Sequence, residues 1–335
     1  MLRYLLRRAL LLVPVLFGVS LLTFVLIRLV PGDPVAIMLQ GEGTSAADLQ
    51  RLRAEWGLDA PLPAQYVSYM THLLTGDFGR SFMLQQPVLP VILDALPATI
   101  ELAVCSLLIA LVIALPIGVL AAIHHHGPID RLGLLLAVLG VSMPGFWIGI
   151  LLVLIFSVTL NWLPASGRID YNADLQPVTG FYLLDSVLTA NGDALQDTLA
   201  HLIMPALVLG TSLAAVTTRM MRSSMLEVTR QEYITCARSK GLAERVVILR
   251  HMLRNALLSV VTVVGIQAGT LLGGAVVIET IFAWPGIGRL TVQAIGARDY
   301  FLLEGIVLCF ALTRIVFNVL TDVVYHVLDP RIRFS

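Results

Sequence analysis

Long runs of apolar residues dominate the chain. Five runs carry no charge over the ~20 residues that a helix needs to cross ~30 Å of hydrocarbon, and a sixth is interrupted only by Arg314. The six runs are residues 9–27, 102–123, 132–163, 198–218, 255–278 and 305–321. We read the first as an uncleaved helix, because no small-residue cleavage site follows it. The pattern predicts an all-α polytopic membrane protein with six transmembrane helices.

Two runs have internal features that predict local structure. The third is longer than one span needs and contains Pro144 and Gly145, so we expect a kink or break there. In the fifth, Gly265, Gly269 and Gly273 recur every four residues. Because glycines on one helix face let another helix approach closely, we expect this face to pack against a neighbouring helix.

Two segments between the runs are longer than turns. In the first, Ser45 and Asp48 resemble a capping box, Gly57 closes that helix and Pro63 opens another. The second, 161–197, is rich in Asp, Asn, Gly and Pro, which favours irregular structure. Its acidic residues suit either an external partner or plain solvation. We therefore expect a first span (1–30), an extracytoplasmic helical region (31–96) and a five-helix permease core (97–335) that includes a cytoplasmic loop (222–254) and the extracytoplasmic loop 161–197.

Charge narrows the possible functions. Of the residues, 57% are hydrophobic and 13% charged, and 22 basic and 22 acidic side chains cancel, so nothing points to a nucleic-acid partner. Lys240 is the only lysine, and Gly241 rather than Ser or Thr follows it, which excludes a Walker A phosphate loop. With the N-terminus inside, fourteen basic residues fall in inner segments and six in outer ones. This bias predicts that both termini are cytoplasmic.

Polar groups in or near the spans are candidates for function, because burying charge in a bilayer is costly. Arg314 lies within a span, and four acidic residues lie near span ends, namely Glu101, Glu279, Glu304 and Asp322. For Arg314 we expect a structural ion pair or a bond to a second subunit rather than substrate contact. We interpret the run 124–126, three histidines, as a solvated turn and expect no metal site. Three scattered cysteines and the absence of a GxSxG motif give no support to disulfides, a zinc cluster or a catalytic nucleophile.

The inner segment 222–254 is long and strongly basic. Its part QEYITCARSKGL, residues 231–242, predicts a helix ended by Gly241, with a second helix leading into the fifth span. A rigid helix joined to two membrane helices can pass movement from a cytoplasmic partner to the spans. The alternative is an amphipathic helix that rests on anionic lipid headgroups.

This segment resembles the coupling loop of the permease subunits of ABC importers. Aligned on Gly241, Ala237 matches the pattern Glu-Ala-Ala-x3-Gly, whereas Thr235 and Cys236 depart from it in the way that the peptide-importer branch does. LLTFVLIRLVPGDP, GLDAPLPAQY, GDFGRSF, ETIFAWPGIGRL and DPRIR are also similar to that branch. The resemblance covers essentially the whole chain. It is to the first (B-type) permease of dipeptide, oligopeptide and nickel importers, most of all to the dipeptide member.

The resemblance implies a type I permease fold and a non-enzymatic transport subunit in the bacterial inner membrane. Implied partners are a second homologous permease, two cytoplasmic ABC ATPase subunits that bind ATP and Mg²⁺, an extracytoplasmic peptide-binding protein and membrane lipid. This chain would bind no cofactor, and would import dipeptides or short peptides by alternating access. Nickel, longer oligopeptides or gradient-driven secondary transport are the alternatives. The residues expected to contact the ATPase are Glu232, Tyr233, Thr235, Ala237, Arg238, Lys240 and Gly241.

Overall fold

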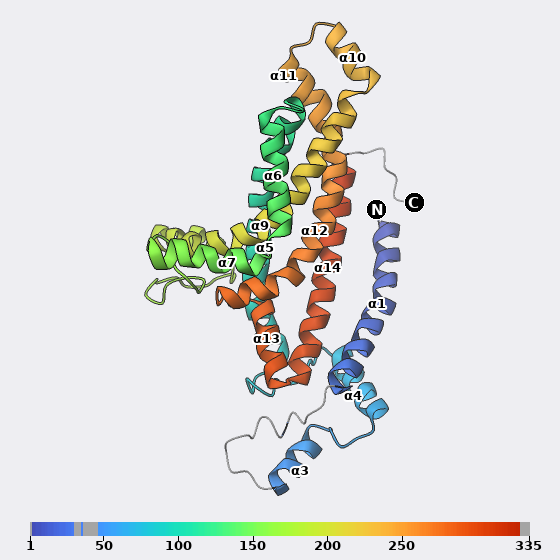
Figure 1. Ribbon diagram of the computed structural model, residues 1–335. Helices are drawn as coiled ribbons and strands as arrows, with labels where there is room; N and C mark the ends of the chain where they lie inside the picture. Colours follow the sequence, from blue (N-terminus) through green and yellow to red (C-terminus); the bar gives the residue numbers. More distant parts are fainter. Residues whose placement is uncertain (1, 30–34, 36–45, 329–335) are drawn as a thin grey trace. The chain divides into compact units, whose positions relative to one another are not determined.

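The computed structural model describes residues 2–29, 35 and 46–328. Within these residues all regular elements are helical, apart from an isolated bridge between Arg80 and Pro87, which confirms the predicted all-α class. The α-helices are α1 (Leu2–Leu29), α3 (Ala46–Glu55), α4 (Leu62–Leu74), α5 (Val88–Ile123), α6 (Pro128–Ser142), α7 (Gly145–Leu152), α8 (Tyr182–Leu188), α9 (Gly192–Thr229), α10 (Glu232–Ser239), α11 (Glu244–Val246), α12 (Leu253–Ile281), α13 (Ile287–Ala297) and α14 (Tyr300–Leu328). Two π-helices, η1 (Val153–Thr159) and η2 (Val247–Met252), continue α7 and α11. Figure 1 labels most of the α-helices along the ribbon.

The predicted spans fall on long apolar helices. Five helices of the described chain are long and apolar enough to cross a membrane, and the count reaches six when a bent pair forms one span. That pair is α6 with α7 and η1, which meet at an angle of 99°. The break confirms the one predicted at Pro144, which lacks the N–H needed to continue α6 and stands at the N-cap of α7.

The chain folds as two compact units, and each unit is made of segments that are separated in the sequence. Of the described residues, unit 1 comprises 2–29, 35, 46–97 and 286–313, and unit 2 comprises 98–285 and 314–328. Helices α5 and α14 each contribute to both units. The segment 286–313, which we placed in the permease core, thus joins the same unit as the N-terminal region.

Unit 1 holds the short helices predicted for the first long segment. Helix α4 carries Pro63 in its first turn, and α3 ends just before Gly57, whereas Ser45 of the expected capping box lies outside the described residues. Trp56 stacks on Phe82 with ring centroids 4.2 Å apart. Arg28 of α1 pairs with the buried Glu304 of α14 at 2.5 Å, which ties these two helices together.

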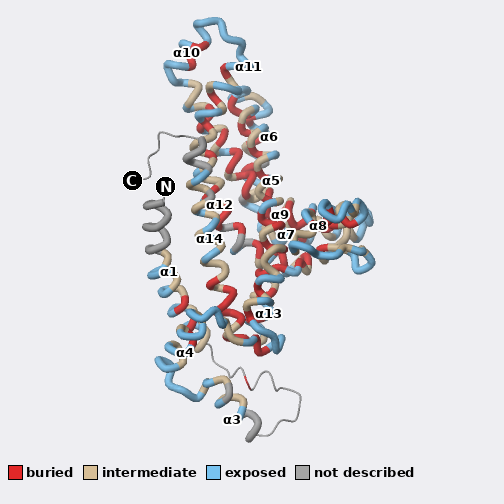
Figure 2. Tube along the Cα trace, turned by 180° about the vertical axis from the view of Figure 1, so that it is seen from behind, coloured by how far each residue is buried: buried red, intermediate tan, exposed pale blue. Residues whose placement is uncertain are grey.

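Unit 2 is built around α9, which packs against α12, α6, α7 and α8. Its buried residues run along α9 and the facing side of α12, while α10 and α11 are largely exposed at one end of the unit (Figure 2). Helices α5 and α9 approach closely where glycines replace larger side chains. A Cβ on Gly118 would lie 2.7 Å from Cβ of Met221, and one on Gly210 would lie 2.9 Å from the carbonyl oxygen of Ser106.

The second long segment is only partly irregular. Residues 161–181 lack regular structure, as expected, but α8 and the first turn of α9 occupy most of 182–197, where the prediction was wrong. Asn191 explains the start of α9, because its side chain accepts a hydrogen bond from the Ala194 N–H and caps the helix. Asp185 is fully buried and does not contribute to an acidic surface.

Candidate coupling helix and translocation groove

Helix α10 is anchored to unit 2 by one apolar face. Ile234 is 0% exposed and Ala237 is 7% exposed, and their spacing of three places them on the same side of the helix. Both belong to a buried cluster that includes Met221 and Met225 of α9 and Val247 of η2. Movement of α10 would therefore be transmitted to α9 and to the start of α12.

The opposite face of α10 is polar and exposed. Tyr233 stands out there as a large aromatic side chain that is 43% exposed. Six of the seven residues predicted to contact an ATPase are exposed, namely Glu232, Tyr233, Thr235, Arg238, Lys240 and Gly241. Ala237 differs from these six residues, because its side chain packs inward against unit 2. Its contact with an ATPase stays a prediction.

The end of α10 is shaped by Gly241. Its φ of +76° lies in the left-handed region that side chains disfavour, and a Cβ added there would meet no atom within 4 Å. Across this turn the Arg238 guanidinium binds the Glu244 carboxylate through two hydrogen bonds of 2.6 and 3.2 Å. Such an exposed pair adds little stability, but it orients α10 relative to α11.

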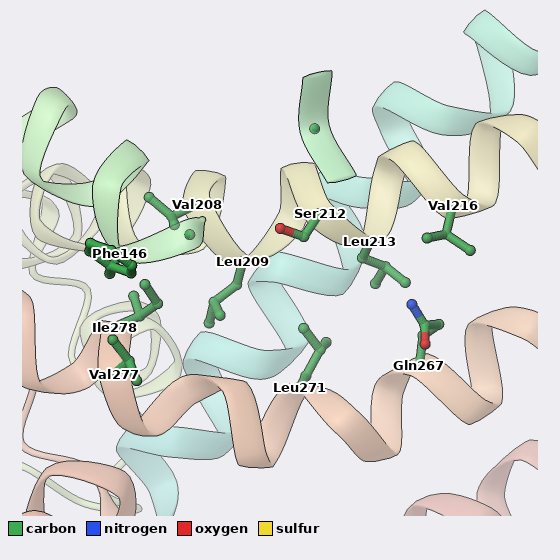
Figure 3. Close-up of a pocket in the computed structure, with 12 residues that line it drawn as sticks. Phe146, Val208, Leu209, Ser212, Leu213, Val216, Gln267, Leu271, Val277 and Ile278 are labelled. Carbon is green, nitrogen blue, oxygen red and sulfur yellow. The ribbon is translucent and has the colours of Figure 1, made fainter. Parts of the chain in front are cut away.

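A groove opens where the α6–α7 pair breaks. Its volume is about 460 Å³, and Val216 of α9 faces Gln267 of α12 across it (Figure 3). Apart from Ser212 and Gln267 its side chains are apolar. The lining residues are Gly140, Gly145, Phe146, Val208, Leu209, Ser212, Leu213, Val216, Gln267, Leu271, Val277 and Ile278.

Two buried hydrogen bonds join α5 to the end of α12 and to the turn that follows it. Glu279, a predicted intramembrane polar residue, is fully buried and accepts a 2.7 Å hydrogen bond from the Thr99 hydroxyl. The Trp284 indole N–H donates to the Ala98 carbonyl oxygen at 2.9 Å. These bonds fix the end of α12 and the turn after it against α5.

The loop 161–181 is held by a buried ion pair that no local sequence pattern predicts. Arg168 donates two hydrogen bonds, of 2.6 and 3.0 Å, to one oxygen of Glu101 on α5, and a third to the Gly180 carbonyl oxygen. The other Glu101 oxygen accepts from the Leu183 N–H at 2.8 Å. Nearby, the Asp185 carboxylate accepts hydrogen bonds from the Thr179 N–H, the Thr179 hydroxyl and the Gly180 N–H.

Burial raises the pKa of the Asp185 carboxyl, but these hydrogen bonds outweigh burial and leave its pKa below the ordinary value. Because Asp185 belongs to a segment that we expected to be solvated, its burial was not predicted. The only sequence signal for its hydrogen bonds is that Gly180, a residue that favours turns, lies five positions before it. The sequence separation of Arg168 from Glu101 gave no local signal of their pairing.

The remaining predicted span residues fall in different environments. Arg314 is exposed and has no ion pair within residues 2–29, 35 and 46–328, so the structural ion pair expected of it is not found within the described chain. Asp322 is half-buried on α14. Neither Arg314 nor Asp322 lines the groove described above.

The three glycines of α12 also differ. Gly265 is buried, and a Cβ there would overlap the Thr321 side chain of α14, as a packing face requires. Gly269 is buried beside the Arg314 side chain, 3.7 Å from the position of an added Cβ. Gly273 is exposed with open space around it, so the packing expected of it is not found among the described residues.

Comparison with known proteins accounts for the whole chain. The family described as "Binding-protein-dependent transport system inner membrane component" matches residues 114–334, and its N-terminal counterpart matches residues 1–103. The chain belongs to this family. It is therefore a permease of the ABC transporter class, a transport subunit embedded in a membrane.

Curated relatives match this permease from end to end. It is 45% identical over 336 residues to the dipeptide transport system permease protein DppB of Escherichia coli K12, covering 99% of both chains. It is equally similar, over 337 residues and 99% of both chains, to the di/tripeptide transport system permease protein DppB of Pseudomonas aeruginosa. A glutathione transport system permease protein, GsiC of Pectobacterium atrosepticum, is 40% identical over all of both chains.

A solved structure supports the fold of this permease. The MetNI methionine ABC transporter in inward-facing conformations superposes with a TM-score of 0.54 at 16% identity, over 72% of this chain and 97% of that one. The likeness establishes the type I permease architecture and, at this identity, nothing about the cargo.

Proposed function

We propose that this permease forms half of the translocation pathway of an ATP-driven importer of dipeptides and other short peptides. The observation that carries the proposal is identity of 40–45% along the full chain to permeases named for dipeptides, di/tripeptides and glutathione. A second homologous permease supplies the other half of the pathway. An extracytoplasmic peptide-binding protein delivers the cargo, and two cytoplasmic ABC subunits hydrolyse ATP.

The polar face of α10 is the proposed ATPase contact. It combines an exposed aromatic side chain, Tyr233, with the charged residues Glu232, Arg238 and Lys240, and exposed aromatic anchors often dominate the energy of protein interfaces. Its apolar face is packed onto α9 and η2. Closure of the ATPase pair would therefore move both membrane helices and drive alternating access.

The groove at the α6–α7 break is the proposed passage surface. Within a membrane, irregular backbone is tolerated where it is covered by protein or lines a water-filled cavity. The break at residues 143–144 lies between two apolar helices and borders the groove. A mainly apolar wall with only Ser212 and Gln267 as polar groups fits a passage that accepts short peptides without reading their charges.

The topology proposed for this permease places both termini and α10 in the cytoplasm, at the inner face of the bacterial inner membrane. The excess of basic residues in the segments then assigned to the inside supports it. The loop 161–181 and helices α3 and α4 would then lie on the outer side of the membrane.

Coupling can be tested at Gly241. We expect Gly241→Leu in the four-subunit importer, reconstituted together with its binding protein, to abolish most dipeptide uptake while ATP hydrolysis continues, because the new side chain projects into the ATPase contact. Uptake and hydrolysis should be measured in the same proteoliposomes.

Gly57→Leu is the matched control. Gly57 also has a positive φ, +65°, and open space at its Cβ position, so both substitutions carry a similar backbone cost of about 1–2 kcal/mol. We expect Gly57→Leu to retain coupled uptake. Normal coupled uptake by Gly241→Leu would refute the proposed contact.

A further inference from the structure

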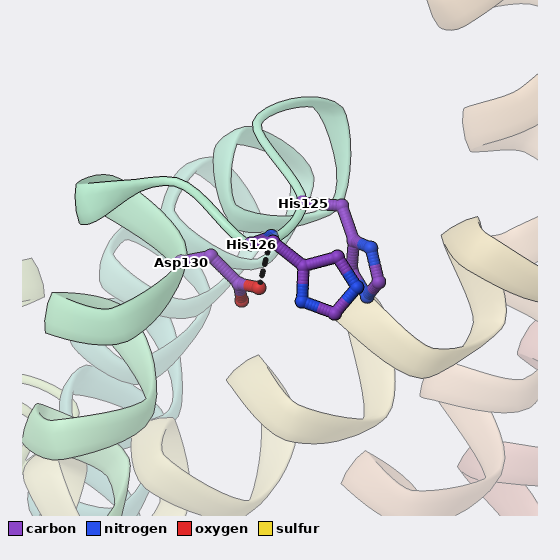
Figure 4. A group of neighbouring side chains, drawn as sticks. All are labelled: His125, His126 and Asp130. Atoms are coloured by element: carbon purple, nitrogen blue, oxygen red, sulfur yellow. Dashed lines mark hydrogen bonds between the residues drawn. The ribbon is translucent and has the colours of Figure 1, made fainter.

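The turn between α5 and α6 brings together side chains that can bind a metal ion. His125, His126 and Asp130 each offer one ligand atom, and these atoms lie within 4.8 Å of one another. The two imidazole rings lie side by side, with centroids 3.7 Å apart, and the Asp130 carboxylate lies next to the His126 backbone (Figure 4). Both histidines are exposed, so ions can reach the cluster from solvent. Asp130 is buried, so the protein holds its carboxylate in place.

The backbone of the turn is held in place by the same carboxylate. The His126 N–H donates to Asp130 Oδ2 at 2.9 Å, and the φ of His126 is +65°. Arg222 of α9 binds Asp130 through Nε to Oδ1 at 2.5 Å and through Nη2 to Oδ2 at 2.8 Å. The position of the turn is thus fixed relative to α9 before any ion binds.

Asp130 retains the capacity for one further partner. A carboxylate has about four lone-pair positions. Arg222 and the His126 N–H occupy three of them, two on Oδ2 and one on Oδ1. The remaining position on Oδ1 is available to a cation, although the positive charge of Arg222 reduces its attraction.

In place of the solvated turn without a metal that we expected from the sequence, we propose that His125, His126 and Asp130 form a site for a borderline divalent transition-metal ion such as Zn²⁺, Ni²⁺ or Cu²⁺. Two imidazoles and one carboxylate suit these ions, and water or a small side-chain shift completes the coordination. Mg²⁺ and Ca²⁺, which require oxygen ligands, would not bind. Because Arg222 offsets the carboxylate charge, we expect micromolar rather than tighter affinity.

The site would lie close to the coupling helix. Arg222 is preceded on α9 by Met221, and Met221 packs in the same buried cluster as Ile234 of α10 and Ala122 at the end of α5. A bound ion would therefore stiffen the turn that borders the anchor of α10.

The test is Zn²⁺ binding to the full-length permease, purified with a tag that contains no histidine and placed in lipid nanodiscs. We expect about one ion per chain in competition with a chromophoric chelator, and Cu²⁺ paramagnetic resonance that reports nitrogen ligands. The double variant His125→Ala/His126→Ala should bind Zn²⁺ at least ~10-fold more weakly. Even the loss of a residue that only hydrogen-bonds to a metal ligand typically lowers metal affinity by ~10-fold or more. Both side chains are exposed, so the variant should fold normally.

His72→Ala, at an exposed histidine of α4, is the control and should bind like the wild type. Zn²⁺ binding that is unchanged in the double variant, or absent from the wild-type permease at concentrations that saturate the chelator, would overturn the proposal.

Discussion

At the residue scale, one carboxylate of α5 organises much of the segment between η1 and α9. Glu101 accepts hydrogen bonds from Arg168 and from the Leu183 N–H, and the Arg168 guanidinium lies 3.8 Å from the centroid of the Tyr182 ring. Both charged side chains are almost completely buried. The loop is consequently fixed to α5, which a solvated loop would not be.

Removing Glu101 should be strongly destabilising. Glu101→Ala leaves Arg168 buried without its partner, and such a loss costs about 3–5 kcal/mol. We expect a clear fall in the thermal unfolding temperature of the purified permease. Glu244→Ala removes the exposed pair with Arg238 instead and should change that temperature little. Equal effects of the two substitutions would contradict the buried pairing.

Asp185 should make the loop sensitive to acid. Its pKa in the folded protein lies below the ordinary value of about 3.9, so its stabilising effect is fully present above that pH and is lost as the pH falls through the lower folded value. The protection of residues 175–190 against hydrogen exchange, relative to the intrinsic exchange rate at each pH, should therefore fall in this acidic range. In Asp185→Asn the acid-dependent loss of protection should disappear; an unchanged pH profile would argue against this role.

Individual residues were the hardest feature to predict from sequence. The resemblance to coupling loops predicted a partner contact for Tyr233, Arg238 and Gly241, which are exposed, but the inward direction of Ala237 depends on where α10 packs. Likewise, Glu101 and Arg168 are 67 residues apart, and no local pattern links them. Such pairings are set by the tertiary structure, and a local sequence pattern carries no information about them.

At the scale of elements, the sequence predicted the long helices and their interruptions well. Apolar runs correspond to α1, α5, α9, α12 and α14, and Pro144 marks the break of the remaining pair. The π-helices η1 and η2 were not predicted, because a change from i+4 to i+5 bonding leaves the composition of a run unchanged. The close contacts at Gly118 and Gly210 were not predicted either, because these glycines do not recur every four residues as those of α12 do.

Packing of α12 against α14 gives a prediction at this scale. Gly265→Ala places a methyl group in the space of Thr321 and should cost about 1–3 kcal/mol by overpacking. Gly273→Ala enters open space and should be neutral or slightly stabilising, since alanine favours helix. Thermal unfolding in detergent compares the two variants. A Gly273→Ala variant that is less stable than Gly265→Ala would contradict the packing seen here.

At the scale of the whole molecule, the zero net charge conceals an uneven distribution. Basic residues concentrate in the segments assigned to the cytoplasm, including the one that carries α10. Family membership and the all-α class could be anticipated from the complete set of motifs. The division into two units could not, because residues 286–313 join the N-terminal unit through contacts distant in sequence.

The central claim is that transport by this permease is driven by ATP hydrolysis on partner subunits. The most direct test is uptake of a radiolabelled dipeptide into proteoliposomes that contain this chain, the second permease, both ATPase subunits and the binding protein. We predict uptake that requires ATP on the ATPase side and persists without an ion gradient. Gradient-driven uptake of the dipeptide by this chain alone, without ATP, would contradict the account.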